Sequence, residues 1–447
     1  MTGAPRVAVV GGGLAGLRAA VTCTDAGAEV RLFEARARLG GATWSTRKRG
    51  LVVDNGQHVF MRCCTAYRSF LDRLGVAEQA WLQDRLAVPV AAPGGPRAWI
   101  RRQSFPAPAH LGASLLRFPY LRPAERVRAG VTALRVTRLD PDDERLDRVS
   151  FGSWLHDAGV RSEAERAFWD LLIRPTLNLP GEEASLALAV KVLRTGFLDT
   201  SDAADIGFAA VPFEALHADP ARQALERAGA RIETRAAVSA IDCHDEGVRL
   251  RVQGAEVEAD ALVLATPPEV AAELAPDVAG LDRHGLAQLG RSAIVNLHLW
   301  FDRPVLDVPF LAGWNTPLQW IFDRTRAADV DRGQVLTVSL SAGDEWLGKS
   351  NAALREIFLP ALHALLPASR EAKLLEFFAV NEPAATFRQA PGCRSWRPKN
   401  ATKHPRLWLA GNWTDTGWPA TMESAVRSGE DAAQGLLRRL GTWETSV

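Results

Sequence analysis

The 447-residue sequence has little cysteine, almost no net charge and no long apolar run, and each shortage excludes a class of protein. Its five cysteines are too few and too scattered for a disulfide framework or a zinc site, so a reducing compartment is expected. A formal net charge of +1 gives no reason to expect a nucleic acid partner. Because no stretch of roughly 18 uncharged apolar residues is present, the sequence predicts no membrane-spanning helix.

Tyrosine is also scarce. The chain has 14 tryptophans and 17 phenylalanines but only two tyrosines, so large apolar rings greatly outnumber phenol hydroxyl groups. A compositional bias accounts for this pattern, and so would walls for an apolar ligand or anchors at an interface. Both interpretations stay open at this point.

The strongest local signal is a glycine-rich turn near the start of the chain. A short apolar strand, 7–10, runs into Gly11, Gly13 and Gly16, which form the pattern G-x-G-x-x-G. In this pattern Gly11 permits a tight turn and Gly13 lets the backbone approach a pyrophosphate. Gly16 lets the next helix pack closely on the strand. A turn of this kind without a ligand is the alternative.

A helix and a second strand follow in the register of a dinucleotide-binding fold. The helix starts at Leu14 and Ala15, so its N–H groups and positive dipole end would point at phosphate. The second strand, Val30 to Phe33, ends at Glu34, about 20 residues after the glycines, where this fold places the acid that binds a ribose hydroxyl. Together these elements predict a Rossmann-like nucleotide site.

The residues after this acid narrow the choice of dinucleotide. Glu34 to Gly41 resembles the E-x-x-x-x-x-G-G extension of FAD-binding flavoenzymes in the amine oxidase and phytoene desaturase superfamily. The resemblance implies that the nucleotide loop continues along the pyrophosphate through Ala35, Arg36, Gly40, Gly41 and Ala42. Many members have arginine after the glycine pair. Here that position is Ala42, so Arg38 or Arg47 would have to supply the contact.

The closing segment, 409–429, is a second strong signal. It reads as a strand, a polar turn and the start of a helix, in which Pro419 suits the first turn and Thr421 can cap. Free N–H groups of Thr421 and Met422 would face the electron-rich edge of a flavin pyrimidine, and the helix dipole would stabilise negative charge on the reduced ring. An ordinary strand–helix connection is the alternative.

With this segment, the chain resembles the squalene-associated FAD-dependent desaturases, better described as hydroxysqualene dehydroxylases. The residues that carry the resemblance are 54–58, 177–180, 183–185, 295–302, 385–387, 397–398 and 410–429. The chain departs from the family at Gly411-Asn412, where Gly-Asp is usual. Trp418 and Ser424 also stand where leucine and glycine are more usual.

The resemblance implies which further residues contact FAD. They are Asn55, Gly56, Gln57, His58, Val238, Ala265, Gly411, Asn412, Pro419 and Ala420. Val238 would bond adenine through its backbone. The stretch from Asp54 to His58 would pass near the isoalloxazine, which makes His58 the first candidate for a catalytic acid and Asp54 the second. A lone histidine is more often a structural hydrogen-bonding group, and this alternative stays open.

By the same resemblance, the reaction removes the allylic hydroxyl of hydroxysqualene and leaves squalene, a step in squalene and hopanoid biosynthesis. Reduced flavin would deliver hydride, an acid would protonate the departing hydroxyl, and faces of Trp and Phe would stabilise positive charge on the allylic carbon. The rivals are desaturation of a polyisoprenoid or oxidation of an amine by oxidised FAD, or a non-catalytic FAD-binding protein. Nothing identifies the electron donor, because no second G-x-G-x-x-G is present for a nicotinamide cofactor.

We expect an α/β protein in which two domains interleave. Its length exceeds the usual size of one hydrophobic core. A Rossmann-like FAD-binding domain of the glutathione-reductase type would collect 1–85, 205–275 and 395–447. An α+β substrate domain would collect 86–204 and 276–394. Helical runs at 109–117, 123–136, 163–172 and 184–195 and strands at 295–301, 318–322 and 335–340 support this second domain.

A long isoprenoid is nearly insoluble in water and would have to be taken from a bilayer. Residues 109–136 are the predicted dock, with Leu111, Leu115, Leu116, Phe118, Tyr120 and Leu121 beside Arg117, Arg122, Arg126 and Arg128. Such a pattern fits an in-plane interfacial segment. It equally fits an ordinary amphipathic helical pair that covers the substrate domain. We therefore expect a cytoplasmic protein, with peripheral contact at the inner face of the cell membrane as the interpretation to test.

Overall fold

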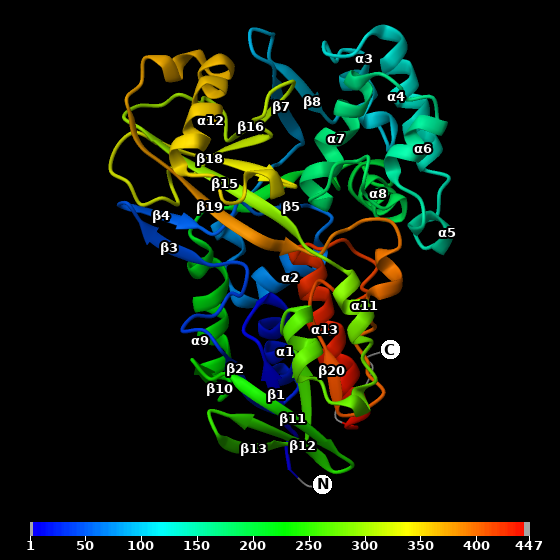
Figure 1. Cartoon of the computed structure of the whole chain (residues 1–447), viewed down its shortest axis with the longest axis vertical. Helices are drawn as coiled ribbons and strands as arrows, with labels where there is room; N and C mark the ends of the chain where they lie inside the picture. The colour runs from blue at the N-terminus through cyan, green and yellow to red at the C-terminus, as the bar shows by residue number, and fades with distance from the viewer. Residues whose placement is uncertain (1–2, 442–447) are drawn as a thin grey trace.

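The computed structural model describes residues 3–441, and the fold is built around two main sheets (Figure 1). The first sheet is entirely parallel, with the strand order β10-β2-β1-β14-β20. Apart from Arg6, strands β1, β14 and β20 read as apolar runs because both faces of the sheet are covered there, whereas β2 and β10 include charged residues. They are β1 (Arg6–Val10), β2 (Glu29–Glu34), β10 (Arg231–Thr234), β14 (Ala261–Leu264) and β20 (Leu407–Leu409).

Alternate residues of β1 show what covers each face. Val7 and Val9 belong to one buried cluster with two helices, whereas Ala8 and Val10 belong to another cluster with a small antiparallel sheet. Since successive side chains of a strand point to opposite faces, the parallel sheet lies between the two layers. The covering elements are α1 (Leu14–Asp25), α13 (Met422–Arg439), β11 (Val238–His244), β12 (Gly247–Val252) and β13 (Ala255–Ala259).

The second main sheet is mixed and has the order β19-β15-β18-β17-β16-β7-β8. Helix α12 (Asn351–Leu365) covers one face, where Leu354 and Phe358 pack in one cluster with Val295 and Leu297. The strands are β7 (Ala87–Ala91), β8 (Ala98–Arg101), β15 (Ser292–Phe301), β16 (Phe310–Gly313), β17 (Trp320–Asp323), β18 (Gln334–Ser341) and β19 (Leu374–Thr386).

A helical layer lies beside this sheet, at the upper right of Figure 1. It contains α3 (Gly112–Leu116), α4 (Pro123–Val136), α5 (Glu144–Asp147), α6 (Phe151–Asp157), α7 (Glu163–Leu177) and α8 (Leu186–Leu193). Among residues 3–441, no helix is long and apolar enough to cross a bilayer.

The remaining elements connect these layers. The helices are α2 (Thr65–Leu74), α9 (Asp219–Arg227), α10 (Pro268–Leu274) and α11 (Arg283–Gln288). The short strands are β3 (Ser45–Lys48), β4 (Leu51–Asp54), β5 (Val59–Met61), β6 (Ala80–Leu82) and β9 (Ile206–Ala209). The pair β3–β4 leads directly into the turn at 54–58.

The strands of the parallel sheet all come from the ranges 1–85, 205–275 and 395–447 that the sequence assigned to the FAD-binding domain. The strands of the mixed sheet come from 86–204 and 276–394. The domain boundaries themselves stay a prediction. Residues 1–2 and 442–447 of the first set lie outside the described residues.

Three elements differ from the sequence prediction. The predicted helix at 109–117 is shorter, because Pro108 precedes a single tight turn and the α-helix covers only Gly112–Leu116. Helix α13 begins at Met422 rather than Pro419, because Thr421 caps it. Strand β19 was not predicted, since a proline and several glutamates interrupt its apolar pattern.

Candidate functional site

The glycine loop after β1 is packed backbone against backbone. A Cβ atom on Gly16 would lie 1.9 Å from the carbonyl oxygen of Gly11. One on Gly11, whose φ is +107°, would lie 2.4 Å from the carbonyl oxygen of Ala265. One on Gly41 would lie 2.7 Å from the Cα of Gly13. Residues with side chains cannot take these positions, so the glycine loop, the glycine pair and Ala265 form one backbone-lined cradle.

The N-terminus of α1 opens into this cradle. Gly13 is the N-cap and supplies no side chain, and the first turn carries no acidic residue. Leu14 and Ala15 in that turn are buried. A buried helix N-terminus that lacks a side-chain cap still has N–H groups to satisfy, and its positive dipole end favours an anion such as phosphate.

Glu34, at the end of β2, holds the cradle from the other side. Its Oε2 accepts a hydrogen bond from the Gly12 N–H at 2.7 Å, and its Oε1 accepts one from the Arg36 N–H at 2.8 Å. A carboxylate accepts about four hydrogen bonds, so capacity remains for a hydroxyl. The Glu34 carbonyl also accepts from the Ala236 N–H at 2.9 Å, which brings the residues just before Val238 beside the acid.

Two arginines were predicted to replace the missing arginine at exposed Ala42, and the structure separates them. Arg38 stacks 4.1 Å over the Trp44 ring, and its Nε is buried without a hydrogen-bond partner among the described residues. Burial, with Arg36 nearby, lowers the pKa of Arg38. Arg47 instead forms an exposed ion pair with Asp329. Of these two arginines, Arg38 is therefore the one with a guanidinium N–H that remains available to bind an anion.

The N-terminus of α13 supplies a second group of backbone donors, although the Thr421 side chain caps it. Thr421 Oγ1 accepts from the Ser424 N–H at 3.2 Å, and the Ala420 N–H donates to Gln389 Oε1 at 2.9 Å. Within residues 3–441, the N–H groups of Thr421 and Met422 have no acceptor. Met422 is only 9% exposed, so these N–H groups lie at a largely buried helix end.

Gly429 brings the two helix ends into one site. A Cβ atom there would lie 2.1 Å from the Ala15 carbonyl oxygen, so α13 crosses α1 at its first turn. From Met422 to Gly429 is two helical turns, about 10 Å along the axis. The backbone donors at the two helix N-termini are therefore set apart by roughly that distance.

The polar turn before α13 is held by a buried cation. Arg397, which is 5% exposed, donates to the carbonyl oxygens of Asn412 at 3.3 Å and Thr414 at 2.6 Å. Burial lowers the pKa of Arg397. The hydroxyl of Ser424 contacts the Thr416 hydroxyl at 2.7 Å, so the serine that departs from the family pattern is used inside the turn. Gly411 begins the turn beside these residues, and Pro419 is buried just before the helix.

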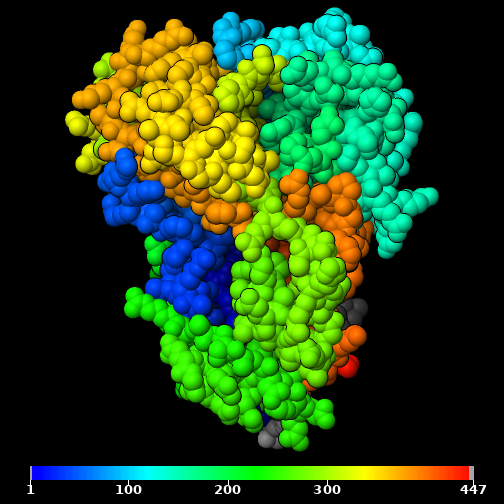
Figure 2. Space-filling view, in the orientation of Figure 1, coloured from blue at the N-terminus to red at the C-terminus, as the bar shows by residue number. Residues whose placement is uncertain are grey.

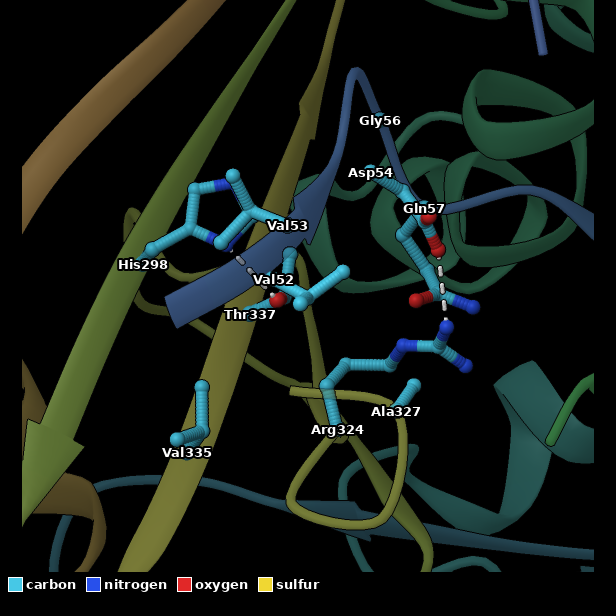
Figure 3. A pocket seen from close by; sticks show the side chains of 10 residues that line it. All are labelled: Val52, Val53, Asp54, Gly56, Gln57, His298, Arg324, Ala327, Val335 and Thr337. Atoms are coloured by element: carbon cyan, nitrogen blue, oxygen red, sulfur yellow. Dashed lines mark hydrogen bonds and ion pairs between the residues drawn. The ribbon is translucent and has the colours of Figure 1, made fainter. Parts of the chain in front are cut away.

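Asp54 is tied into the protein by several partners. Arg324 donates to its Oδ2 at 2.8 Å, while Ser45 and the Phe213 N–H donate to its Oδ1 at 2.7 and 3.1 Å. Figure 3 shows the guanidinium reaching the carboxylate beneath the turn. Both side chains of the ion pair are 8% exposed, and burial lowers the pKa of Arg324. This arrangement holds the start of the turn 54–58 in place.

The rest of the turn rests on β15. The Gln57 N–H donates to Asn296 Oδ1 at 3.2 Å, and a Cβ on Gly56 would lie 3.1 Å from Asn296 Nδ2. Asn55 connects the turn to the glycine pair, because its N–H donates to the Trp44 carbonyl at 2.9 Å. These bonds place the turn next to the loop that follows Gly41.

His58 ends the turn with its ring edge against Phe213, the ring centroids being 4.9 Å apart. Its Nδ1 lies 3.3 Å from the Gly56 carbonyl oxygen. Burial lowers the pKa of His58 below its ordinary value of 6.5, so the imidazole is mostly neutral at neutral pH. A neutral imidazole can hydrogen-bond a hydroxyl, and it becomes a strong proton donor only at lower pH.

A small cavity lies beneath this turn, with about 10 Å³ of space, roughly enough for one water molecule. It is lined by Val52, Val53, Asp54, Gly56, Gln57, His298, Arg324, Ala327, Val335 and Thr337 (Figure 3). His298 Nδ1 lies 3.1 Å from the Thr337 hydroxyl, and burial lowers the pKa of His298 to about 3. The cavity is far too small for an isoprenoid.

Sequence reasoning missed several of these residues. They are Arg324, Asn296, His298, Gln389 and Arg397, all of which are less than a tenth exposed. One signal was available, because Asn296 and His298 alternate with apolar residues along β15. Polar residues on one face of an otherwise buried strand indicate a polar site on that face.

A family model described as flavin-containing amine oxidoreductase matches residues 14–437. The chain belongs to this family. Its cofactor is therefore FAD, and the Rossmann-like FAD-binding fold expected from the sequence is confirmed. The backbone donors at the N-termini of α1 and α13, the buried Nε of Arg38 and the spare capacity of Glu34 all fit a long, doubly anionic dinucleotide.

Among curated relatives, the chain is similar to two hydroxysqualene dehydroxylases. It is 26% identical to that of Zymomonas mobilis, over 95% of this chain and 97% of the relative, and 27% identical to that of Sinorhizobium fredii, over 98% and 99%. A 15-cis-phytoene desaturase of Synechococcus elongatus is 26% identical over 97% of this chain and 96% of its own.

Solved structures support the same fold. A putrescine oxidase structure superimposes with a TM-score of 0.74 at 20% identity, covering 98% of this chain and 99% of that chain. Cyclohexylamine oxidase from Brevibacterium oxydans has a TM-score of 0.71 at 17% identity, over 98% and 100%. At these identities the likeness concerns the fold alone.

Proposed function

We propose that this FAD-dependent oxidoreductase is a hydroxysqualene dehydroxylase. The observation that carries the proposal is the similarity to two bacterial hydroxysqualene dehydroxylases over nearly the whole of both chains. Relatives that act on long isoprenoids, rather than on small polar molecules, also support a polyisoprenoid substrate. The electron donor stays unassigned.

In this proposal, residues at the N-termini of α1 and α13 would hold FAD. The glycine loop and the N-terminus of α1 bind the pyrophosphate, with Arg38 as the additional cation. Glu34 binds a ribose hydroxyl, and the backbone near Val238 meets the adenine. The N–H groups of Thr421 and Met422 bind the flavin pyrimidine, and Asn412 is available to a ribityl hydroxyl.

The chemistry requires one hydride and one proton for each hydroxyl removed, and the products are the hydrocarbon and water. Reduced FAD supplies the hydride. His58 binds the hydroxyl through its imidazole and, when protonated, donates the proton that makes water the leaving group. The buried Phe213 ring packs against His58 and helps to hold the imidazole in place.

Asp54 has a different role in this proposal from the one suggested by the sequence. Its carboxylate is occupied by Arg324, Ser45 and a backbone N–H. We therefore assign it as a positioning residue that fixes the turn before His58. The catalytic role suggested for Asp54 by the sequence stays a prediction.

Amine oxidation is less well supported. An amine oxidase is expected to need aromatic side chains, often tyrosine, beside the flavin. Tyr67 is buried and its hydroxyl lies 2.7 Å from His217 Nε2. The Tyr120 hydroxyl accepts from the Ala92 N–H and donates to the Pro96 carbonyl. Both phenols of the chain are therefore engaged in structural contacts.

A polyisoprenoid desaturase is the second candidate, because a phytoene desaturase matches the chain with comparable identity and coverage. The two activities differ in the redox state of the flavin that reacts. Chemically reduced enzyme should be incubated anaerobically with 12-hydroxysqualene, and the product analysed by mass spectrometry. The proposal predicts squalene, with no reaction by the oxidised enzyme. Dehydrogenation of a saturated isoprenoid segment by the oxidised enzyme, and no squalene, would favour the desaturase.

A further inference from the structure

Helix α4 presents an apolar stripe to solvent. Val127 is 60% exposed, Val131 44% and Leu134 51%. Their spacing of four and three residues places them on one side of the helix. The opposite side is buried and contains Ala129 and Val136 together with Glu125 and Thr132. Helix α4 is therefore apolar on its exposed side as well as on part of its buried side, and packing within the chain does not explain the exposed stripe.

Leu116, at the end of α3, extends the stripe. It is 61% exposed. Leu115 lies against Gly130, in the middle of the α4 stripe, and Arg126 Nη1 donates to the Leu116 carbonyl at 2.7 Å. Leu116 therefore lies beside α4. We call Leu116, Val127, Val131 and Leu134 the distal apolar face, since α3 and α4 lie at the end of the molecule away from β11–β13 (Figure 1 and Figure 2).

The structure changes which residues form the dock predicted at 109–136. Phe118 and Leu121 are each 1% exposed, and Leu111, Leu115 and Tyr120 are half-buried, so only Leu116 of the predicted apolar set is exposed. Two of the predicted arginines also turn inward, because Arg126 bonds backbone carbonyls and Arg128 pairs with Glu165. The exposed apolar residues are instead those of α4, which the sequence prediction had not singled out.

Positive charge surrounds this face. Residues 101–138 contain eight arginines and a single acid, Glu125, in a chain whose net charge is only +1. Glu125 is buried and bonded to Arg122. Arg117 and Arg138 are exposed beside the face. An apolar face flanked by cations complements an anionic lipid surface, where apolar side chains enter the headgroup region and arginines meet the headgroups.

We propose that the distal apolar face docks the protein on an anionic membrane. A second copy of the chain is a poorer occupant, because a stable dimer buries about 800 Å² on each partner, roughly 20–30 residues, far more than four side chains supply. The cations around the face would also repel their copies in a symmetric dimer. The proposal rests on exposure and charge, and it stands whether or not the substrate is hydroxysqualene.

The test is co-sedimentation of the FAD-loaded protein with vesicles of phosphatidylcholine alone or mixed with phosphatidylglycerol. We expect binding to the mixed vesicles at low salt, and loss of binding at high salt. Val131→Asp/Leu134→Asp should weaken binding at least about tenfold. Arg117→Gln/Arg138→Gln should weaken it roughly 30-fold, since each cation near such a surface contributes about 1 kcal/mol.

Val278→Asp/Ile357→Asp is the matched control, because these residues are 52% and 39% exposed on other parts of the surface. It should bind like the wild type. Flavin absorbance and thermal melts establish that each variant is folded. A wild type that stays in the supernatant at low salt overturns the proposal, and so does equal loss of binding in the control. Lipid-free dimerisation that Val131→Asp/Leu134→Asp abolishes would also overturn it, in favour of a second copy.

The same variants separate this proposal from the proposed function. With hydroxysqualene dispersed in detergent, Val131→Asp/Leu134→Asp should turn over at the wild-type rate, because Val131 and Leu134 are exposed and are not residues of the candidate site. If the reduced enzyme does not convert hydroxysqualene, the proposed function fails, but the wild type should still bind the mixed vesicles at low salt. A loss of detergent-phase activity in this variant would count against docking as the role of the face.

Discussion

The glycine loop after β1 and the turn 54–58 after β4 are both tight backbone turns, but they are held in different ways. In the glycine loop, backbone lies against backbone, as at Gly16 and Gly11. In the turn, buried side chains from remote strands supply the contacts. Gln57 bonds Asn296, 239 residues away, and Asp54 bonds Arg324, 270 residues away.

This difference determines what each turn tolerates. The glycine loop depends on the absence of side chains, so any added atom meets a backbone that cannot move independently. The turn depends on paired charges and hydrogen bonds, so removing one partner leaves another buried and unpaired. The following substitutions test this contrast, from the largest expected effect to the smallest.

Gly16→Ala should be the most damaging change. Its Cβ would lie 1.9 Å from the Gly11 carbonyl oxygen, so the backbone of the loop must be displaced, and the cost exceeds that of ordinary side-chain overpacking. We expect little soluble protein and no bound FAD, measured by soluble yield and flavin absorbance. Gly112→Ala is the control, because nothing lies within 4 Å of its Cβ. Normal flavin content in Gly16→Ala would contradict the cradle.

Arg324→Met should destabilise the protein by about 3–5 kcal/mol, because it leaves the Asp54 carboxylate buried without its partner. Urea unfolding measures the loss. Arg324→Met/Asp54→Asn removes both charges and should recover a large part of the stability. If the double variant is no more stable than the single one, the ion pair does not hold the turn.

His58→Gln should slow single-turnover dehydroxylation about 10²–10⁴-fold, the usual contribution of a general acid, while FAD content stays normal. Because burial lowers the pKa of His58 below 6.5, the protonated donor becomes populated only as the pH falls below that value. The wild-type rate should therefore rise as the pH decreases from 6.5. This rise should be missing in His58→Gln, and its persistence there would remove His58 from proton transfer.

Glu34→Gln should weaken FAD binding about tenfold, and Asn412→Ala should weaken it less. Charge-assisted hydrogen bonds are roughly twice as strong as neutral ones, and tenfold corresponds to about 1.4 kcal/mol. Glu34 also accepts from Gly12, so the substitution weakens the glycine loop itself. Titration of apoprotein with FAD gives both constants. An equal or larger loss in Asn412→Ala would contradict the assignment of Glu34.

The contrast also explains what the sequence could predict. Gly11, Gly16 and Glu34 lie within one short stretch, and the chemistry of that stretch needs those residue types at that spacing. Thr421 as a cap is equally local, and the structure confirms it. The partners of the turn could not be predicted, because nothing in the sequence near Arg324 indicates that it pairs with Asp54. Pairing across 270 residues depends on how the mixed sheet meets β4.

The exposed side of α4 could not be predicted from local sequence either. Amphipathic spacing predicted helices at 109–136, but it could not show which side of α4 is buried. Ala129, Thr132 and Val136 lie on the buried side together with Glu125, which accepts from the Arg122 N–H at 2.8 Å. A sequence pattern assigns apolar residues to the core by default, and Val127, Val131 and Leu134 are exceptions.

The most direct test of the central claim is an anaerobic single-turnover experiment. The enzyme is photoreduced, mixed with hydroxysqualene, and followed by flavin absorbance while squalene is measured in quenched samples. We predict that the flavin is reoxidised as squalene forms, one molecule for each flavin. If the reduced flavin persists with hydroxysqualene, and the oxidised enzyme is instead reduced by a polyisoprenoid, dehydroxylation is wrong and desaturation is correct.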